Sequence, residues 1–434
     1  MDKLLKEAAR NSDEAEVYVR TTKVTPIEFE NGRCKSIRLV NLLEIGLRVI
    51  KNGQLGFSYA TSLEYRSEMV KEALRTAEYG IKAHFNFALP SPLERILNHD
   101  PAVEGIKIDK LIQDTAKIID WFRDKNIEAP VSVRTQVSTT SVTILNSLGL
   151  DAQFRTTGVN SLCYLILEGS GVGPIVYDEN SSYRLLGEDR LNEVHQYYLK
   201  CQRQTSVPTK PMKVIFTQPS MHTIIWRIAS GVSGQSLIDK ITPLEKRVGE
   251  KIADHRLTLI DNSHMKGHPS ARPFDDEGVP TKVLPIIENG VFKNFLYDLK
   301  TAAVVGTKST GHGYKSGMWG GDVTTPVSPY PCHPVFEPGD VSYEEMICRV
   351  DEGILLQLPN GAHSGNIPAG DFSVNVGLGY YIKDGVILGR VEDAMISGNI
   401  YDLLNNLNCV SRDFDCHGMP WLLFDNVNVA GRQG

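Results

Sequence analysis

One stretch of the chain, residues 272–313, carries most of the polar groups whose types and spacing suggest chemistry. It opens with an acidic turn and closes with a glycine-rich loop, and its candidate residues are Asp275, Asp276, Glu277, Ser309, Thr310 and His312. Neighbouring carboxylates can bind a divalent cation, but acids just before a glycine and a proline also satisfy the backbone amides of a turn. The loop lacks the spacing of a phosphate-binding loop. A binding site and simple turn chemistry both stay open for this stretch.

The histidines form no recognisable zinc motif. Two histidines and a glutamate on one helix would indicate a zinc hydrolase, because the histidines hold the metal and the glutamate activates water. No His-Glu-x-x-His sequence occurs, and His222 begins a predicted helix that contains no second ligand. His264 and His268 have i,i+4 spacing, but Gly267 and Pro269 favour a loop over a helix. We therefore expect structural roles for these histidines.

Two Cys-His dipeptides, Cys332-His333 and Cys416-His417, place a thiol next to an imidazole in the sequence. A nearby imidazolium lowers the pKa of a thiol and can activate it as a nucleophile. Adjacent residues rarely point toward each other, however, and the sequence identifies no acid that would orient either imidazole. Both dipeptides are interpreted as bystanders.

A hairpin and a helix are predicted to position the polar stretch. Two apolar runs meet at Asn289-Gly290, the strongest short-range signal for a hairpin, and a helix is predicted over residues 298–305. The rest of the region from residue 212 is predicted to contain helices over 221–230, 243–253, 343–351 and 400–410, and strands over 214–217, 257–261, 354–391 and 421–429. This pattern predicts a β-rich C-terminal domain with a large, mostly antiparallel sheet.

The N-terminal half contains two units that each begin with a helix and continue as an antiparallel meander. The predicted helices cover residues 2–11 and 67–79 in the first unit and 109–125 in the second. The predicted strands cover 16–20, 25–30, 36–40, 43–50 and 55–59, and then 131–137, 141–146, 150–156 and 161–168. Turns are expected at Asn31-Gly32 and Asn52-Gly53. The repeat predicts an α+β fold with domains at residues 1–88, 105–206 and 212–434, separated by proline-rich connectors.

Composition narrows the functional classes. The chain has 434 residues, 41% of them hydrophobic, and a net charge of −6 without a basic block. A protein that grips phosphates needs a concentrated basic surface, so direct nucleic-acid binding is not expected. No apolar run approaches the roughly 20 residues that span a bilayer, and the charged N-terminus lacks a signal peptide. Seven scattered cysteines indicate reduced thiols. The sequence thus predicts a cytoplasmic protein with no membrane association.

Several separate motifs, taken in order, resemble the PmbA/TldD family, whose members were first described as modulators of DNA gyrase. The matching runs are Arg272 to Thr281, Ile287 to Val291, Tyr297-Asp298, Lys308 to Gly311, Gly370 to Val374, Tyr381 to Gly385, Ser397 to Asn399 and Val429 to Gly431, with weaker matches at Gly46 to Val49 and Gly56-Phe57. The resemblance therefore extends over nearly the whole chain.

The resemblance implies a role in peptide processing. The family includes a metallopeptidase type with a His-Glu-x-x-x-His zinc helix and a sister type, PmbA or TldE, without it, and the two form a heterodimer. This chain resembles the metal-free type, since no His-Glu pair occurs in it. Cys416 falls near the region where metal-bearing members supply a cysteine ligand, but no ligand role is carried onto it. The resemblance implies that this chain binds no cofactor and that zinc is held by a TldD-like partner subunit.

The expected function is that of a non-catalytic subunit which helps to hold a small, unfolded peptide by pairing with an exposed strand edge. Its substrate or subunit surface is predicted at Asp275, Asp276, Glu277, Ser309, Thr310, His312 and Asp371, with no catalytic residue and no metal ligand. Three alternatives stay open. The chain could be a self-sufficient peptidase that uses His222 and Cys416, a non-proteolytic adaptor for gyrase or another large partner, or a homodimer that binds small peptides.

Overall fold

A long curved sheet of seven strands forms the N-terminal half of this computed structural model, which describes residues 1–167 and 173–431. The strand order is β4-β3-β1-β5-β6-β7, with β2 paired to β1. The strands are β1 (Glu14–Glu30), β2 (Arg33–Ile37), β3 (Val40–Lys51), β4 (Gln54–Ala60), β5 (Val131–Asn146), β6 (Asp151–Leu165) and β7 (Ile175–Asn180). The α+β class predicted from the sequence is confirmed.

The two N-terminal units share this one sheet, because β1 pairs with β5 in an antiparallel ladder from Glu16↔Asn146 to Glu30↔Ser132. The Asn31-Gly32 and Asn52-Gly53 turns are confirmed between β1 and β2 and between β3 and β4. The strands predicted in pieces are continuous in the structure. The polar residues that interrupt the apolar pattern, such as Thr21 and Thr22 in β1, continue the ladder without a break. Residue 168, at the end of one predicted strand, lies outside the described residues.

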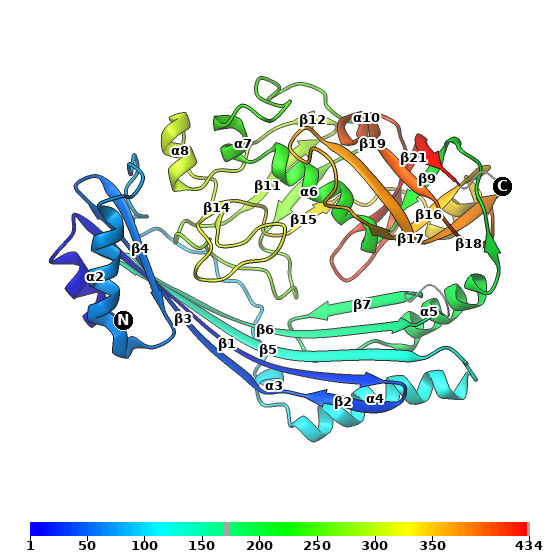
Figure 1. Cartoon of the computed structure of the whole chain (residues 1–434), viewed down its shortest axis with the longest axis horizontal. Helices are drawn as coiled ribbons and strands as arrows, with labels where there is room; N and C mark the ends of the chain where they lie inside the picture. The colour runs from blue at the N-terminus through cyan, green and yellow to red at the C-terminus, as the bar shows by residue number, and fades with distance from the viewer. Residues whose placement is uncertain (168–172, 432–434) are drawn as a thin grey trace.

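Helices cover the sheet at both ends. The N-terminal helices are α1 (Asp2–Ala9), η1 (Leu63–Tyr65), α2 (Arg66–Ala77), α3 (Pro101–Glu104), α4 (Ile108–Asp124) and α5 (Glu188–Cys201). The apolar stripe of α4, which includes Ile118 and Phe122, packs with Val133 and Val159 of the sheet. As Figure 1 shows, α4 lies on the face of the sheet away from the C-terminal domain. The sequence predicts α1, α2 and α4 but misses α5 and β7.

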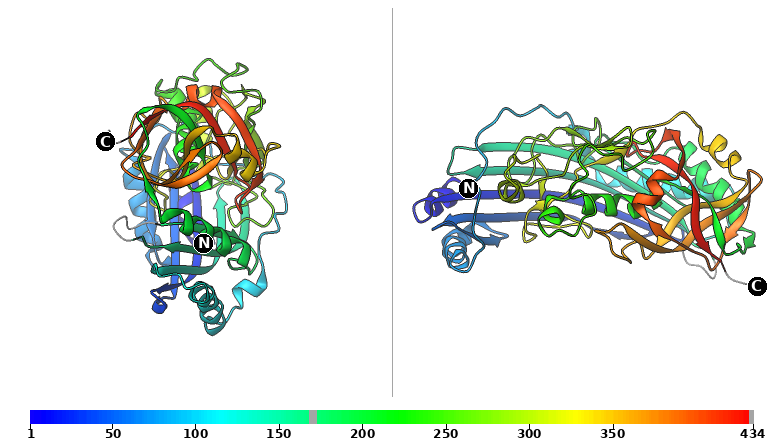
Figure 2. Two further views of the ribbon diagram at one scale, coloured as in Figure 1. Left: turned by 90° about the vertical axis from the view of Figure 1, so that its right-hand side faces the viewer. Right: turned by 90° about the horizontal axis from the view of Figure 1, so that it is seen from above.

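The C-terminal domain, from β9 to β21, is built on an eight-stranded sheet with the order β16-β9-β21-β19-β17-β18-β8 and with β20 paired to β21. Its strands are β8 (Gln204–Thr205), β9 (Lys210–Phe216), β16 (Glu352–Asn360), β17 (Asp371–Lys383), β18 (Val386–Val391), β19 (Met395–Asn399), β20 (Leu407–Phe414) and β21 (Pro420–Ala430). An additional pairing of β16 with β17 closes the sheet into a ring, seen end-on in Figure 2, left. The ring consists of β16, β9, β21, β19 and β17, while β20 and the β18-β8 pair branch from it.

The remaining strands and helices of this domain surround the ring. They are η2 (Gln218–Ser220), α6 (His222–Gly231), α7 (Gly234–Ile238), β10 (Leu259–Asn262), β11 (Val283–Glu288), β12 (Val291–Phe292), α8 (Leu299–Val305), β13 (Gly313–Tyr314), β14 (Ser328–Pro329), β15 (Pro334–Phe336), α9 (Tyr343–Cys348) and α10 (Ile400–Asn405). Alternate residues of β9 face different cores, since Val214 packs in the cluster of α6 and Ile215 packs with residues of α5 and α9.

The predicted hairpin at Asn289-Gly290 is confirmed between β11 and β12. The predicted helix over residues 243–253 is wrong. The backbone of this segment forms hydrogen bonds with the hairpin instead. Gly249 N–H donates to the Phe292 carbonyl, and Ile252 N–H donates to the Gly290 carbonyl, both at 2.8 Å. The helix predicted over 400–410 ends at Asn405, because the residues from Leu407 onward pair with β21. None of the helices in the described part of the chain is long and apolar enough to cross a membrane.

Candidate functional site: a groove between the sheet and the C-terminal domain

A groove lies between the long sheet and the C-terminal domain. Its larger part has a volume of about 530 Å³. The sheet lines it with Arg20, Thr22 and Glu44, and the C-terminal domain lines it with Pro269, Ser270, Arg272 and residues 330–332. A smaller part of about 320 Å³ also contacts residues 330–332 and extends to α6. Because the two cavities share these lining residues, we treat them as one feature, the central groove. Figure 1 shows β1, β5 and β6 running beneath the C-terminal domain along this boundary.

The wall that the sheet contributes carries a row of polar groups. Hydroxyls on neighbouring strands, from Thr22, Thr140 and Thr156, lie beside the Arg20–Glu44 pair, and the apolar side chains of Leu42 and Phe154 complete the wall. Arg20 donates two hydrogen bonds to the Glu44 carboxylate, at 2.5 and 2.8 Å, and this bidentate geometry fixes both side chains. These threonines interrupt the alternation of apolar residues in the middle of β1, β5 and β6, and the strands were therefore predicted as shorter pieces. The interruption is the one feature of the sequence that could have indicated a polar wall here.

The facing wall is anchored by Arg272. Its guanidinium carbon lies 5.1 Å from the Phe154 ring centroid and 5.2 Å from that of Tyr314, and Nη1 donates to Asp276 at 3.1 Å. Stacking between two aromatic faces and pairing with a carboxylate are both favourable for a planar guanidinium. Phe154 belongs to β6 and Tyr314 to β13, so Arg272 links the two sides of the groove.

The three consecutive acids of the predicted surface lie inside the fold. Asp275, Asp276 and Glu277 are 0%, 4% and 1% exposed. Asp275 accepts backbone hydrogen bonds from Glu277, Val279 and Gly313 at 2.9 to 3.0 Å, which is turn chemistry. Asp276 accepts from the Lys315 amide at 2.8 Å. These contacts support the turn interpretation of the acids and show that their side chains are buried.

Glu277 also belongs to a buried ion cluster that joins the sheet to the C-terminal domain. Arg48 of β3 donates to Glu16 of β1 at 2.8 Å and to Glu277 at 2.9 Å. Burial raises the pKa of Glu277 to about 7, against the opposing attraction of Arg48. Burial, together with the charge of Arg48, lowers the pKa of Lys315 to about 8. We call Glu16, Arg48 and Glu277 the ion lock.

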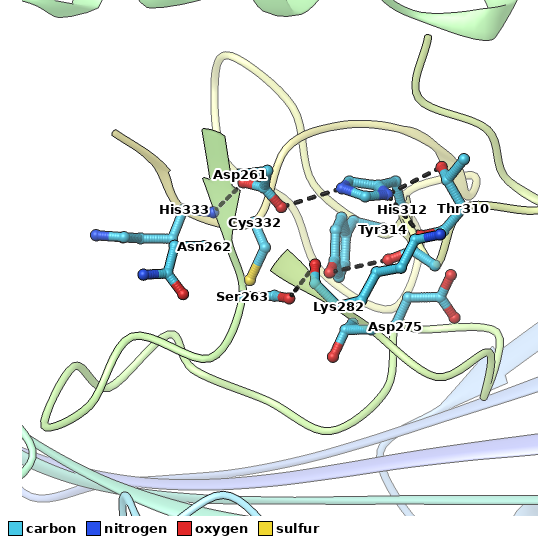
Figure 3. A network of polar contacts seen from close by, with 12 residues as sticks. Asp261, Asn262, Ser263, Asp275, Lys282, Thr310, His312, Tyr314, Cys332 and His333 are labelled. Atoms are coloured by element: carbon cyan, nitrogen blue, oxygen red, sulfur yellow. Dashed lines mark hydrogen bonds and ion pairs between the residues drawn. The ribbon is translucent and has the colours of Figure 1, made fainter. Parts of the chain in front are cut away.

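The glycine-rich loop is fixed by a buried network around Asp261 (Figure 3). Nε2 of His312 donates to one Asp261 oxygen at 3.0 Å, and the His333 amide donates to the other at 2.6 Å. Nδ1 of His312 lies 2.9 Å from the Thr310 hydroxyl. That hydroxyl also accepts the Tyr297 amide hydrogen at 2.8 Å. His312, 1% exposed, therefore organises a loop rather than facing solvent.

The other predicted surface residues occupy two places. The Ser309 hydroxyl is half-buried and donates to the Tyr297 carbonyl at 3.0 Å, in the same loop as Thr310. Asp371 is exposed on β17 and accepts a hydrogen bond from Asn399 at 2.9 Å. Its carbonyl accepts from the buried Arg227 at 2.6 Å. The structure thus groups the acids with the glycine-rich loop through Gly313, while Asp371 belongs to a separate cluster.

Helix α6 borders the groove but does not have the donor set of a zinc helix. Its sequence, from His222 to Gly231, contains one histidine and no acid. Nδ1 of His222 lies 2.8 Å from the Pro219 carbonyl oxygen, and its ring packs on Trp226 with centroids 4.8 Å apart. A His-Glu-x-x-x-His site therefore does not fit the residues of α6.

Three other histidines meet beside the groove. The ring centroids of His268 and His333 lie 4.1 Å apart, and those of His268 and His417 lie 5.2 Å apart. The predicted loop around His268 is confirmed. Sequence reasoning missed the cluster because its members lie in three segments, each with its own turn residues, and no local spacing connects them.

Family models match two regions of the chain. The model described as the PmbA/TldA metallopeptidase C-terminal domain matches residues 209–431, and the model described as PmbA/TldA metallopeptidase domain 1 matches residues 15–78. The first match alone covers more than half of the chain and includes the facing wall of the groove.

Curated relatives and solved structures agree with the family models. A metalloprotease from Methanothermobacter thermautotrophicus is 24% identical over 92% of this chain and 88% of its own length. The metalloprotease PmbA of Escherichia coli O157:H7 is 26% identical over 54% of this chain and 50% of its own length. The crystal structure of TldE from Thermococcus kodakarensis superposes with a TM-score of 0.91 at 26% identity, covering 99% of this chain and 100% of that one. A proposed modulator of a DNA gyrase from Thermotoga maritima shares the fold, with a TM-score of 0.88 at 23% identity and 99% coverage of both chains.

Proposed function

Because the chain belongs to the PmbA/TldD family of metallopeptidases, we propose that it is the non-catalytic, TldE-type subunit of a two-subunit zinc peptidase. In this role it holds a small, unfolded peptide, while a TldD-like partner with a His-Glu-x-x-x-His helix supplies the zinc and cleaves the peptide bond. One observation carries the proposal. The helix that borders the groove lacks a second histidine and a glutamate, while the groove beside it is fully formed.

The chemistry of the groove suits a peptide. Threonine hydroxyls and the Arg20–Glu44 pair offer donors and acceptors along one wall. Aromatic surface lies at the other end, where the Trp226 ring centroid is 5.9 Å from that of Trp319, a side chain that is 76% exposed. Polar groups that match a peptide backbone, with aromatic rings for side chains, bind extended chains with little demand on their sequence.

Co-purification with a TldD-like chain tests the assembly. The two chains are expressed together, and the mass of the complex and its cleavage of an unfolded peptide are compared with those of each chain alone. We expect a heterodimer and peptide cleavage that requires both chains. Peptide cleavage by this chain alone would instead support the self-sufficient peptidase. Assembly of the two chains without peptide cleavage would support the non-proteolytic adaptor.

A groove variant tests the role in peptide binding. In Thr140→Arg a long cationic side chain projects into the groove, so KM of the two-chain enzyme should rise about tenfold or more with assembly intact. Ser141→Arg is the matched control, because adjacent residues of a strand face opposite sides of the sheet and Ser141 lies between Thr21 and Arg155 in the ladder. Equal kinetics in both variants would exclude this groove as the peptide site.

A further inference from the structure

Two histidines and a glutamate from three distant segments converge beside the central groove, and we propose that they bind one divalent transition-metal ion of the zinc class. Glu179 lies on β7, His268 lies in the loop between β10 and β11, and His417 lies in the loop between β20 and β21. One donor atom of each lies within 4.8 Å of the other two. The site is separate from α6, and its occupation does not depend on the proposed function.

The distances between the donor atoms suit a small metal ion. Nε2 of His268 lies 3.0 Å from Nδ1 of His417, and one Glu179 oxygen lies 3.7 Å from the first nitrogen and 4.0 Å from the second. Ligands bound tetrahedrally at 2.0–2.1 Å from zinc are about 3.4 Å apart. Shifts of a few tenths of an ångström would bring all three donors to that separation.

Neighbouring groups hold each ligand in place. The His417 ring stacks on Tyr177, with a centroid distance of 5.2 Å and an interplanar angle of 6°. Nε2 of His333 lies 2.9 Å from the His417 carbonyl oxygen, which fixes the loop. Nδ1 of His268 lies 2.7 Å from the Ser270 hydroxyl and accepts the Ser270 amide hydrogen at 3.2 Å, and these contacts orient the ring.

The donor set indicates the class of ion. Two imidazoles and a carboxylate suit zinc and its neighbours nickel, cobalt and copper, whereas calcium and magnesium prefer oxygen ligands. Asp415, Cys416 and His417 form an overlapping set. The Cys416 thiol, however, donates toward the Tyr177 carbonyl at 3.7 Å, and Asp415 accepts the amide hydrogens of His417 and Met419. Because both groups already have partners within the fold, we assign the site to Glu179, His268 and His417.

The ion would join two parts of the fold. Glu179 belongs to the long sheet and both histidines belong to the C-terminal domain, so the bound metal would cross-link the two. His417 also lines the groove, and three protein ligands leave a fourth position for water. A ligand that binds the folded chain alone stabilises it. Zinc should therefore raise the unfolding temperature of the isolated protein.

Metal titration of the full-length, chelator-treated chain tests the assignment. We expect one Zn²⁺ per chain by calorimetry, visible absorption bands of a low-coordinate site with Co²⁺, and a rise in unfolding temperature with Zn²⁺. His268→Ala should abolish these effects. Glu179→Gln keeps the shape of a side chain that is 19% exposed and should weaken affinity at least about tenfold.

His255→Ala removes a histidine whose side chain is 76% exposed and should bind zinc like the parent. Binding that is absent in the parent, or unchanged in both ligand variants, overturns the proposal. So does binding that is lost in Cys416→Ser but kept in Glu179→Gln, since that result would assign the metal to the overlapping set.

Discussion

The buried carboxyl of Glu277 gives the protein a pH dependence of stability that can be measured. Its folded pKa of about 7 lies above the ordinary value of 4.5. Between these values the folded state binds more protons than the unfolded state, so the contribution of Glu277 to stability falls as pH rises. It is fully present below about pH 4.5 and is lost by pH values above about 7.

Glu277→Gln removes this titration. The free energy of unfolding of the parent minus that of the variant should therefore decrease by up to about 3 kcal/mol between about pH 4.5 and about pH 7. Urea unfolding at several pH values measures the difference. Glu245→Gln, at an exposed position, is the control, and its difference in unfolding free energy from the parent should not change with pH. A difference for Glu277→Gln that stays constant or increases as pH rises would contradict the direction of the Glu277 pKa shift.

At the scale of elements, two Asn-Gly hairpins differ in their surroundings. Gly290 and Gly53 both have left-handed φ angles, of 78° and 72°. A Cβ on Gly290 would lie 2.4 Å from the Ala253 carbonyl oxygen, whereas one on Gly53 would meet nothing within 4 Å. Gly53→Ala should thus cost about 1 kcal/mol from backbone strain alone. Gly290→Ala should cost at least about 1 kcal/mol more, because the segment that bonds to the hairpin must move.

Equilibrium unfolding of both alanine variants measures that difference. Equal losses of unfolding free energy in the two variants would show that residues 249–254 do not pack closely against the hairpin at Gly290. Circular dichroism of each variant provides the control that the fold is retained.

The hairpin at Asn289-Gly290 was predictable from the sequence, because an Asn-Gly turn depends on the φ angles of two adjacent residues. That prediction is confirmed. The segment 243–253 has an apolar pattern that fits a helix, but hydrogen bonds from the hairpin hold it in turns. The cluster of His268, His333 and His417 requires contacts between segments at least 65 residues apart, which no local pattern encodes. The fold class was predictable, whereas the groove and the cluster depend on how the sheet meets the C-terminal domain.

For the molecule as a whole, the ion lock is a buried charged link between the sheet and the C-terminal domain. Arg48→Met leaves two buried carboxylates, Glu16 and Glu277, without their shared cation. Removing one partner from a buried pair typically costs about 3–5 kcal/mol. We expect a loss of that size by calorimetry, together with faster proteolysis of the connector at residues 89–100.

Arg66→Met is the matched control. Its guanidinium is 47% exposed and lies 3.9 Å from Glu7, so the substitution should change stability by no more than about 0.5 kcal/mol. Similar losses in both variants would mean that the buried cluster contributes no more than a surface pair.

The pairing of β1 with β5 has a consequence for synthesis of the chain. β1 is complete at residue 30, but its partner spans residues 131–146, so one edge of β1 stays unpaired while about a hundred residues are translated. At about 5–20 residues per second, that interval lasts from about 5 to about 20 seconds. The ion lock closes later still, after Glu277 has left the ribosome. The ladder between β1 and β5 can therefore be completed only after residue 146 has emerged, and until then the open edge of β1 is a place where a chaperone or a second nascent chain would bind.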